Sequence, residues 1–144
     1  MSVPTYKRGE QKLTVLTKAL ALADHTLTKT RNEKLFPKRS RWQLTNRIVT
    51  AALDIAEAVR KGNSIRVECE QDFLRRRAYQ QQAREAAEWL ATLLDMAYRN
   101  LGTLSGQEAE YWLGLIIDLE DLLSAWRKAD ADAWRKRQKQ ASTR

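Results

Sequence analysis

The stretch SGQEAEYWLGLIIDLEDLLSAW, residues 105–126, carries the clearest folding signal in the 144-residue sequence. Its large apolar residues recur every three or four positions: Trp112, Leu115, Leu119, Leu122 and Trp126, widened by Ile116 and Leu123. This period places them on one face of an α-helix. Ser105 and Glu108, three positions apart, predict a capping box where the helix begins. Because glycine costs about 1 kcal/mol relative to alanine inside a helix, we expect close packing at Gly114.

A long helix over residues 64–100 is predicted immediately before this stretch. Its second half has one apolar stripe: Tyr79, Ala83, Ala86, Leu90, Leu93, Ala97 and Leu101. Its first half is rich in charge, so we expect that half to extend beyond the core or to begin irregularly. Gly102 tolerates left-handed backbone and predicts the end of the helix.

Two further helices are predicted in the first half of the chain. The stripe of the first, over residues 10–32, is Leu13, Leu16, Leu20, Ala23 and Leu27. The stripe of the second, over residues 40–60, is Leu44, Ile48, Ala51, Ile55 and Val59 or Ala58. Both stripes have the helical period.

Local signals predict the ends of these two helices. Pro37 lacks an amide donor and disfavours helical backbone at the residue before it, so a turn separates the helices. Ser40 and Gln43 predict a capping box for the second helix. The pair Gly62-Asn63 predicts its end.

Helices joined by short connections run in alternating directions, so the sequence predicts an all-α fold, an antiparallel up-down-up-down four-helix bundle. We expect an N-terminal segment at residues 1–9, the bundle at residues 10–128 and a basic C-terminal tail at residues 129–144. The single cysteine, Cys69, fits a reducing compartment. No apolar run is long enough to cross a bilayer and no secretory signal is present, so we expect a cytoplasmic protein without a membrane partner.

The net charge of +8 is unevenly distributed along the chain. Residues 1–44 carry ten Lys and Arg against three acidic residues, whereas residues 78–132 carry four against ten. The last twelve residues carry five basic residues and no acidic one. This segregation favours a surface that binds a polyanion, although every helical surface needs some charged coat.

Three basic clusters are the candidate nucleic-acid contacts. The first surrounds the proline turn and comprises Lys34, Lys38, Arg39, Arg41 and Arg47. The second is Arg75, Arg76 and Arg77, and the third lies in the tail and includes Arg135, Lys136 and Arg137. No base-reading motif accompanies them, so binding is expected to follow the phosphate backbone and to weaken with salt. An acidic protein surface is the competing partner for each cluster.

Aromatic residues accompany two of these clusters. Phe36 and Trp42 lie among the first; they either offer a face to an unpaired base or close the end of the bundle. In the tail, Ala133-Trp-Arg-Lys repeats Ala125-Trp-Arg-Lys. Eight residues correspond to about 80° beyond two turns, so Trp126 and Trp134 are expected on different faces. We place Trp126 in the core and assign Trp42 and Trp134 to partner contacts.

Signals for catalysis or metal binding are weak, and no cofactor is expected. Di-iron bundles need two Glu-x-x-His motifs, whereas this chain has one histidine, His25, without such a glutamate. Cys69 lies in a charged stretch in which no basic activator is identified. Asp54 and Glu57 are typical of a solvated helix surface. The sequence therefore predicts a protein that is not an enzyme.

The segment FPKRSRWQLTNRI, residues 36–48, resembles a signature of small four-helix-bundle proteins: Phe-Pro-Lys, then Arg, an aromatic residue and Leu, then Arg-Ile. These are the accessory variability determinant (Avd) of diversity-generating retroelements and the proteins encoded in ribosomal RNA intervening sequences. Residues 119–128 resemble the closing Leu…Leu-x-x-Trp-x-Lys pattern of the same proteins. Ser40 departs from the family, which often has an acidic residue at that position.

The resemblance implies an accessory protein that forms a homopentamer, binds a reverse transcriptase and binds RNA or DNA during mutagenic retrohoming. It carries Lys38, Arg41 and Arg47 over as basic contacts. The alternative that it leaves open is a self-associating structural bundle of the intervening-sequence type without a polymerase partner.

Overall fold

The structure is a computed structural model that describes the backbone of residues 3–143 and the side chains of residues 14–143. The side chains of the N-terminal segment 1–9, and those of Leu13 and Arg144, lie outside the described residues. Within the described part the chain is all helical, with four long helices and no strand. The helices are α1 (Val3–Arg31), α2 (Asn46–Ser64), α3 (Glu70–Leu101) and α4 (Gly106–Ser142). A 3-10 turn, η1 (Lys38–Ser40), and a π-helical turn, η2 (Arg41–Thr45), lie between α1 and α2.

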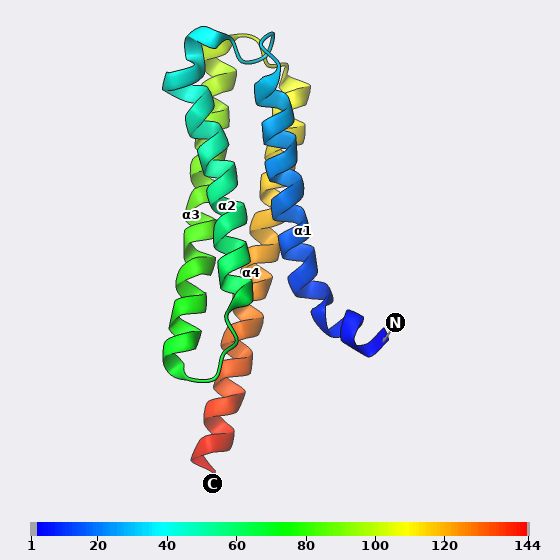
Figure 1. Cartoon of the computed structure of the whole chain (residues 1–144), viewed down its shortest axis with the longest axis vertical. Coiled ribbons are helices and arrows are strands. Elements are labelled where there is room, and N and C mark those ends of the chain that lie inside the picture. Colours follow the sequence, from blue (N-terminus) through cyan, green and yellow to red (C-terminus); the bar gives the residue numbers. More distant parts are fainter. Residues whose placement is uncertain (1–2, 144) are drawn as a thin grey trace.

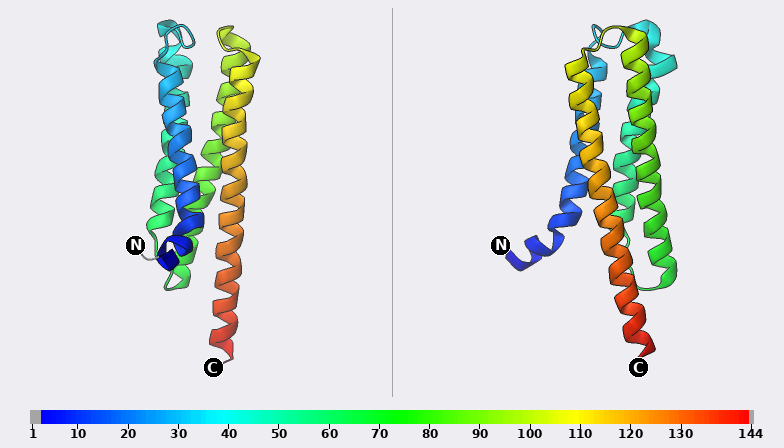
Figure 2. Two further views of the ribbon diagram at one scale, coloured as in Figure 1. Left: turned by 90° about the vertical axis from the view of Figure 1, so that its right-hand side faces the viewer. Right: turned by 180° about the vertical axis from the view of Figure 1, so that it is seen from behind.

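The four helices pack around one elongated core (Figure 1). α1 packs against α2 and α4, and α3 packs against the same two helices. The α1–α2 and α3–α4 connections lie together at one end, drawn uppermost in Figures 1 and 2, and called the upper end below. The loop 65–69 and the last turns of α4 lie at the opposite, lower end, where α4 extends beyond the loop.

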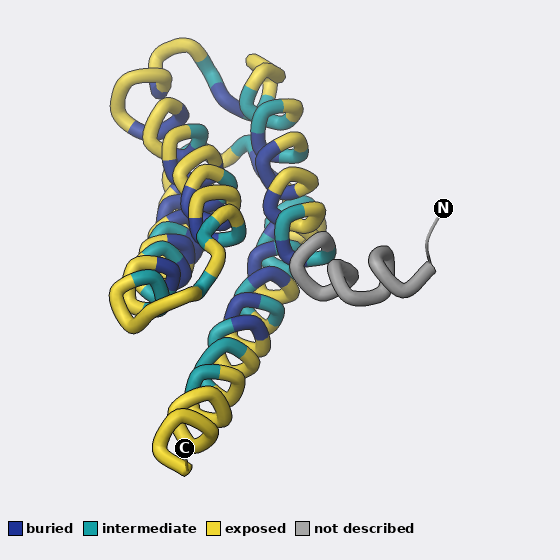
Figure 3. The backbone as a smooth tube through the Cα atoms, turned by 60° about the horizontal axis from the view of Figure 1, so that its bottom comes forward, coloured by how far each residue is buried: buried dark blue, intermediate teal, exposed yellow. Residues whose placement is uncertain are grey.

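The core contains the predicted stripes of α2, α3 and α4. Ile48, Ile55, Leu90 and Leu119 are among its fully buried residues. In Figure 3 the buried residues lie on the sides of the helices that face one another, and the residues of the last turns of α4 are exposed. The periodicity of these three helices therefore predicted the faces that pack together.

The core face of α1 agrees only in part with the predicted one: Ala23 is buried and Leu16 packs against the core, but Leu20 does not. Leu20 is 49% exposed, whereas Val15, Ala19 and Leu22 are buried. Thr26 is buried with them, and its hydroxyl donates to the carbonyl oxygen of Leu22 at 2.8 Å. α1 thus carries two apolar stripes, and small residues such as Ala19 favour the one that lets its neighbours approach closely.

Two predicted helix boundaries are confirmed. Gly102 ends α3 in the left-handed conformation, with φ at 67°. At the start of α4 the backbone N–H of Glu108 donates to the Ser105 side chain, and the backbone N–H of Ser105 donates to the Glu108 carboxylate. The second hydrogen bond favours the ionised carboxylate, so the pKa of Glu108 lies below its usual value.

Other predicted boundaries were wrong. Ser40 makes no capping hydrogen bond, because the chain passes through η1 and η2 before α2 begins. α2 continues through Gly62 to Ser64, and α3 begins at Glu70 rather than at residue 64. Nothing lies within 4 Å of a Cβ placed on Gly114, so the close packing expected there is absent.

Gly62 is required for close packing rather than for a turn. A Cβ placed on it would lie 3.1 Å from Tyr79 Cβ on α3 and 3.2 Å from Trp126 Cη2 on α4. The absent side chain therefore lets three helices converge at this position near the lower end.

Candidate nucleic-acid interface

The basic residues of the first cluster lie together at the upper end. Lys34 follows α1, η1 carries Lys38 and Arg39, η2 begins at Arg41, and Arg47 lies in the first turn of α2. All five side chains are exposed. The turn that holds them is fixed by the fold: the amide of Phe36 donates to Asn32, and the Thr103 hydroxyl donates to the carbonyl oxygen of Leu35 at 2.5 Å. A compact, positively charged end results.

Few carboxylates neutralise this cluster. Lys38 pairs with Glu33 at 3.6 Å, and both side chains are largely hydrated. Among the residues that the structure describes, no acidic side chain lies within ion-pairing distance of Arg39, Arg41 or Arg47. Their guanidinium groups are therefore available for bidentate contacts to phosphate oxygens.

The two aromatic residues of this end have different positions. Phe36 is 3% exposed and packs edge-on against Trp112, with ring centroids 5.9 Å apart. Trp42 is 82% exposed. Phe36 thus closes the end of the bundle. Trp42 does not close it and leaves its ring face exposed to solvent.

A shallow groove of about 360 Å³ borders the same cluster. It lies between the end of α1 and the start of α2, with Arg31, Pro37 and Arg41 among its lining residues. Glu33 is its one acidic lining residue. The charged lining of the groove is thus two arginines and one glutamate, next to the other exposed arginines of the cluster.

The second cluster does not act as one unit, because Arg76 is buried. Its Nε donates to Asp130 Oδ2 at 2.6 Å, a second nitrogen donates to Asp130 Oδ1 at 3.0 Å, and a third donates to the carbonyl oxygen of Ile65. Gln80 donates to the same carboxylate. Arg76 is 3% exposed and its donors already have partners inside the protein, which leaves no free donor at this position for a phosphate. Arg75 is exposed and Arg77 is partly buried.

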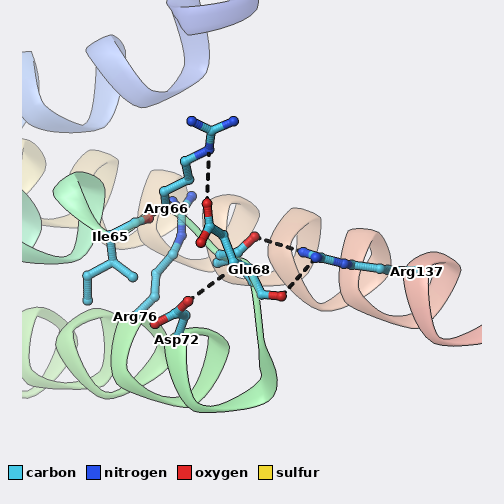
Figure 4. A network of polar contacts seen from close by, with 7 residues as sticks. Ile65, Arg66, Glu68, Asp72, Arg76 and Arg137 are labelled. Atoms are coloured by element: carbon cyan, nitrogen blue, oxygen red, sulfur yellow. Dashed lines mark hydrogen bonds and ion pairs between the residues drawn. The ribbon is translucent and has the colours of Figure 1, made fainter. Parts of the chain in front are cut away.

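The tail is not an independent arm, because α4 continues through it to Ser142. Arg137 reaches the loop 65–69 and donates to the carbonyl oxygens of Val67 and Glu68, each at 2.8 Å (Figure 4). Arg135 pairs with Asp132 at 2.8 Å, and Lys136 is exposed. Most of the predicted tail contacts are thus occupied within the chain.

Trp134 is also occupied. Its ring stacks on Phe73 of α3, with centroids 5.2 Å apart and planes 7° apart. Trp126 and Trp134 line one hollow of about 440 Å³ at the lower end, so the prediction that they occupy different faces was wrong. A core-facing stripe is about 100° wide, which accommodates the 80° between them. Trp134 is partly buried and already has an aromatic neighbour within the chain, whereas its contact with a partner stays a prediction.

Sequence reasoning missed Asp130 and Phe73, which hold the lower end together. The repeat Ala-Trp-Arg-Lys was the available signal, because the tryptophan of its second copy, Trp134, is the residue that stacks on Phe73 near the start of α3. The basic residues consequently occupy opposite ends of the bundle: those of the upper end are mostly free, and several of those of the lower end are bound.

The described residues contain no group of three His, Cys, Asp or Glu side chains placed to hold a metal ion. His25 lies against Tyr111 and Trp112, with ring centroids 5.3 Å from each. Burial, and secondly the charge of Lys29, lower the pKa of His25. Across the described part of the chain, no helix is both long and apolar enough to span a membrane.

Fold and site together define a bundle of four helices with a basic, aromatic-bearing upper end. No protein-family model matches this chain, and none of the curated proteins or solved structures matches it. The likeness to retroelement accessory proteins therefore rests on residues 36–48 and 119–128 alone.

Proposed function

We propose that this protein is a non-enzymatic adaptor of the retroelement accessory type, which binds RNA or cDNA and delivers it to a reverse transcriptase. Its scaffold is an antiparallel up-down-up-down bundle, and it acts in the cytoplasm. The upper end holds the nucleic acid through its phosphates, so recognition is independent of base sequence.

The observation that carries this proposal is the set of exposed arginines at the upper end that lack a carboxylate partner: Arg39, Arg41 and Arg47. Several arginines elsewhere do pair with a carboxylate, as Arg76 does with Asp130 and Arg135 with Asp132. Three unpaired guanidinium groups gathered at one end support binding of a polyanion there.

The adaptor is proposed to be a homo-oligomer, a pentamer by the family resemblance. Leu20 on α1 and Leu53 on α2 are 49% and 45% exposed, and these two helices pack side by side. Exposed leucines on neighbouring helices support contact with a second copy. The same residues also suit the alternative function, a self-associating structural bundle without a polymerase.

Replacing Arg39, Arg41 and Arg47 together by alanine tests the nucleic-acid site. We expect weaker RNA binding in a filter assay, and a log–log salt dependence shallower by about 2, because each lost phosphate contact removes about 0.7–0.9 of slope. Helical content should not change, since all three side chains are exposed.

The matched control replaces three arginines that already pair with carboxylates away from the upper end: Arg66, Arg84 and Arg135. It removes the same formal charge but no free guanidinium, so its affinity and slope should stay closer to those of the wild type. Equal losses in the two triple variants would show that net charge, and not the upper end, determines binding.

Co-purification with a reverse transcriptase, sought among the products of the neighbouring genes, separates the adaptor from the structural bundle. A stable complex supports the adaptor. If no complex forms, and RNA retention is the same at low and moderate salt, the adaptor function is refuted and the structural alternative remains.

A further inference from the structure

We infer that the upper end binds an unpaired nucleic-acid strand, with Trp42 stacking on one base while the neighbouring arginines hold the phosphates. This inference rests on the proposed function and specifies its ligand as single-stranded rather than duplex.

The exposure of Trp42 is the first support. An indole ring buries a large apolar area when it finds a partner, yet this one is 82% exposed on the π-helical turn η2. The other described aromatic rings near basic clusters have partners within the chain, as Trp134 has in Phe73. π-helical turns occur often at functional sites. Trp42 is therefore a ring face that the fold itself leaves uncovered.

The placement of the arginines is the second support. Arg41, directly before Trp42, borders the groove toward α1. Arg47, five residues after it, borders a separate hollow toward α3 that also includes Trp89. Trp42 thus lies in the chain between two exposed arginines that border separate hollows, one toward α1 and one toward α3, an arrangement that suits a strand whose phosphates flank a stacked base.

The surroundings of Trp42 favour a strand over a protein partner. Aromatic anchors of protein interfaces lie in apolar pockets from which water is excluded. The neighbours of Trp42 in the chain, Arg41 and Gln43, are both exposed and polar. A duplex is also disfavoured, because its bases stack on one another and offer no free face to the indole.

The experiment compares a fluorescein-labelled 12-nucleotide RNA strand with the 12-base-pair duplex of the same sequence, by anisotropy at fixed salt. For Trp42→Ala we expect about tenfold weaker binding of the strand, and unchanged binding of the duplex. Trp42→Phe should recover most of the affinity, because phenylalanine keeps a face for stacking. Ile117→Ala, at an exposed apolar side chain of α4 that lines neither hollow, is the control and should bind as the wild type does.

A strand of the same charge with abasic sites in place of bases gives an independent readout. Wild type and Trp42→Ala should bind it equally, since phosphates remain and nothing is left to stack. A defect of Trp42→Ala that persists on the abasic strand, or that is equal on strand and duplex, overturns the inference.

The outcomes also separate this inference from the proposed function. The wild type could bind in a salt-dependent manner through its arginines while Trp42→Ala binds the strand with unchanged affinity. In that case the proposed function is supported and the stacking inference is refuted. If Trp42→Ala loses only the reverse transcriptase, Trp42 is a protein contact and stacking again falls. If the wild type binds neither strand nor duplex, both are refuted.

Discussion

At the scale of single residues, whether an arginine is buried in an ion pair or exposed to solvent depends on whether the fold places a carboxylate beside it. Arg75, Arg76 and Arg77 are consecutive in the sequence, yet only Arg76 turns inward, where it is 3% exposed. Its guanidinium lies 5.3 Å from the ring centre of Trp126 as well as against Asp130. A buried guanidinium with several hydrogen bonds and an aromatic contact is a structural element of the lower end.

Replacing Asp130 by alanine should reduce the free energy of unfolding by about 3 kcal/mol, because it leaves the charge of Arg76 buried without its partner. Urea denaturation followed by circular dichroism measures this. Asp132→Ala is the control: its pair with Arg135 is exposed and three residues away, so a loss below about 0.5 kcal/mol is expected. Similar losses in both variants would contradict the structural role of Asp130.

At the scale of secondary-structure elements, two glycines inside helices have opposite consequences. Gly62 in α2 leaves room for Tyr79 and Trp126, whereas Gly114 in α4 has no neighbour within 4 Å of its Cβ position. Helix propensity alone assigns the same free-energy cost to both positions, since each glycine weakens its helix relative to alanine. The packing around each decides whether that penalty is compensated.

Gly114→Ala should therefore stabilise the protein by about 1 kcal/mol through the higher helix propensity of alanine. Gly62→Ala should instead destabilise it by about 1–3 kcal/mol, because Tyr79 Cβ is attached to the backbone of α3 and yields only if the helices separate. Thermal unfolding of the two variants measures the contrast. A stabilised Gly62→Ala would show that α2 and α3 do not approach as closely as described.

At the scale of the whole molecule, the lower end is held together by contacts between the loop 65–69, α3 and the last turns of α4. Trp134 stacks on Phe73, and Arg137 binds the loop carbonyls. The boundary expected at residue 128 is thus not a structural boundary. Residues 129–137 contact the bundle, and residues 138–143 are exposed.

Shortening the chain tests this division. A chain that ends at Lys128 loses Asp130, Trp134 and Arg137, so its free energy of unfolding should fall by at least as much as in Asp130→Ala. A chain that ends at Arg137 keeps these contacts and should unfold at nearly the same urea concentration as the full chain. If both shortened chains were as stable as the full one, the tail would be a separate arm, as the sequence had suggested.

The sequence by itself determined the all-helical architecture, the buried faces of α2, α3 and α4, the Ser105 cap, the end of α3 at Gly102 and the basic turn around Pro37. These properties are local, because helical period, capping and backbone preference act over only a few residues. The tertiary structure alone decided which stripe of α1 faces inward, which of Phe36 and Trp42 is buried, and which arginines are free. Those outcomes depend on contacts between distant residues, such as the pair Arg76–Asp130 across 54 positions, which no local pattern encodes.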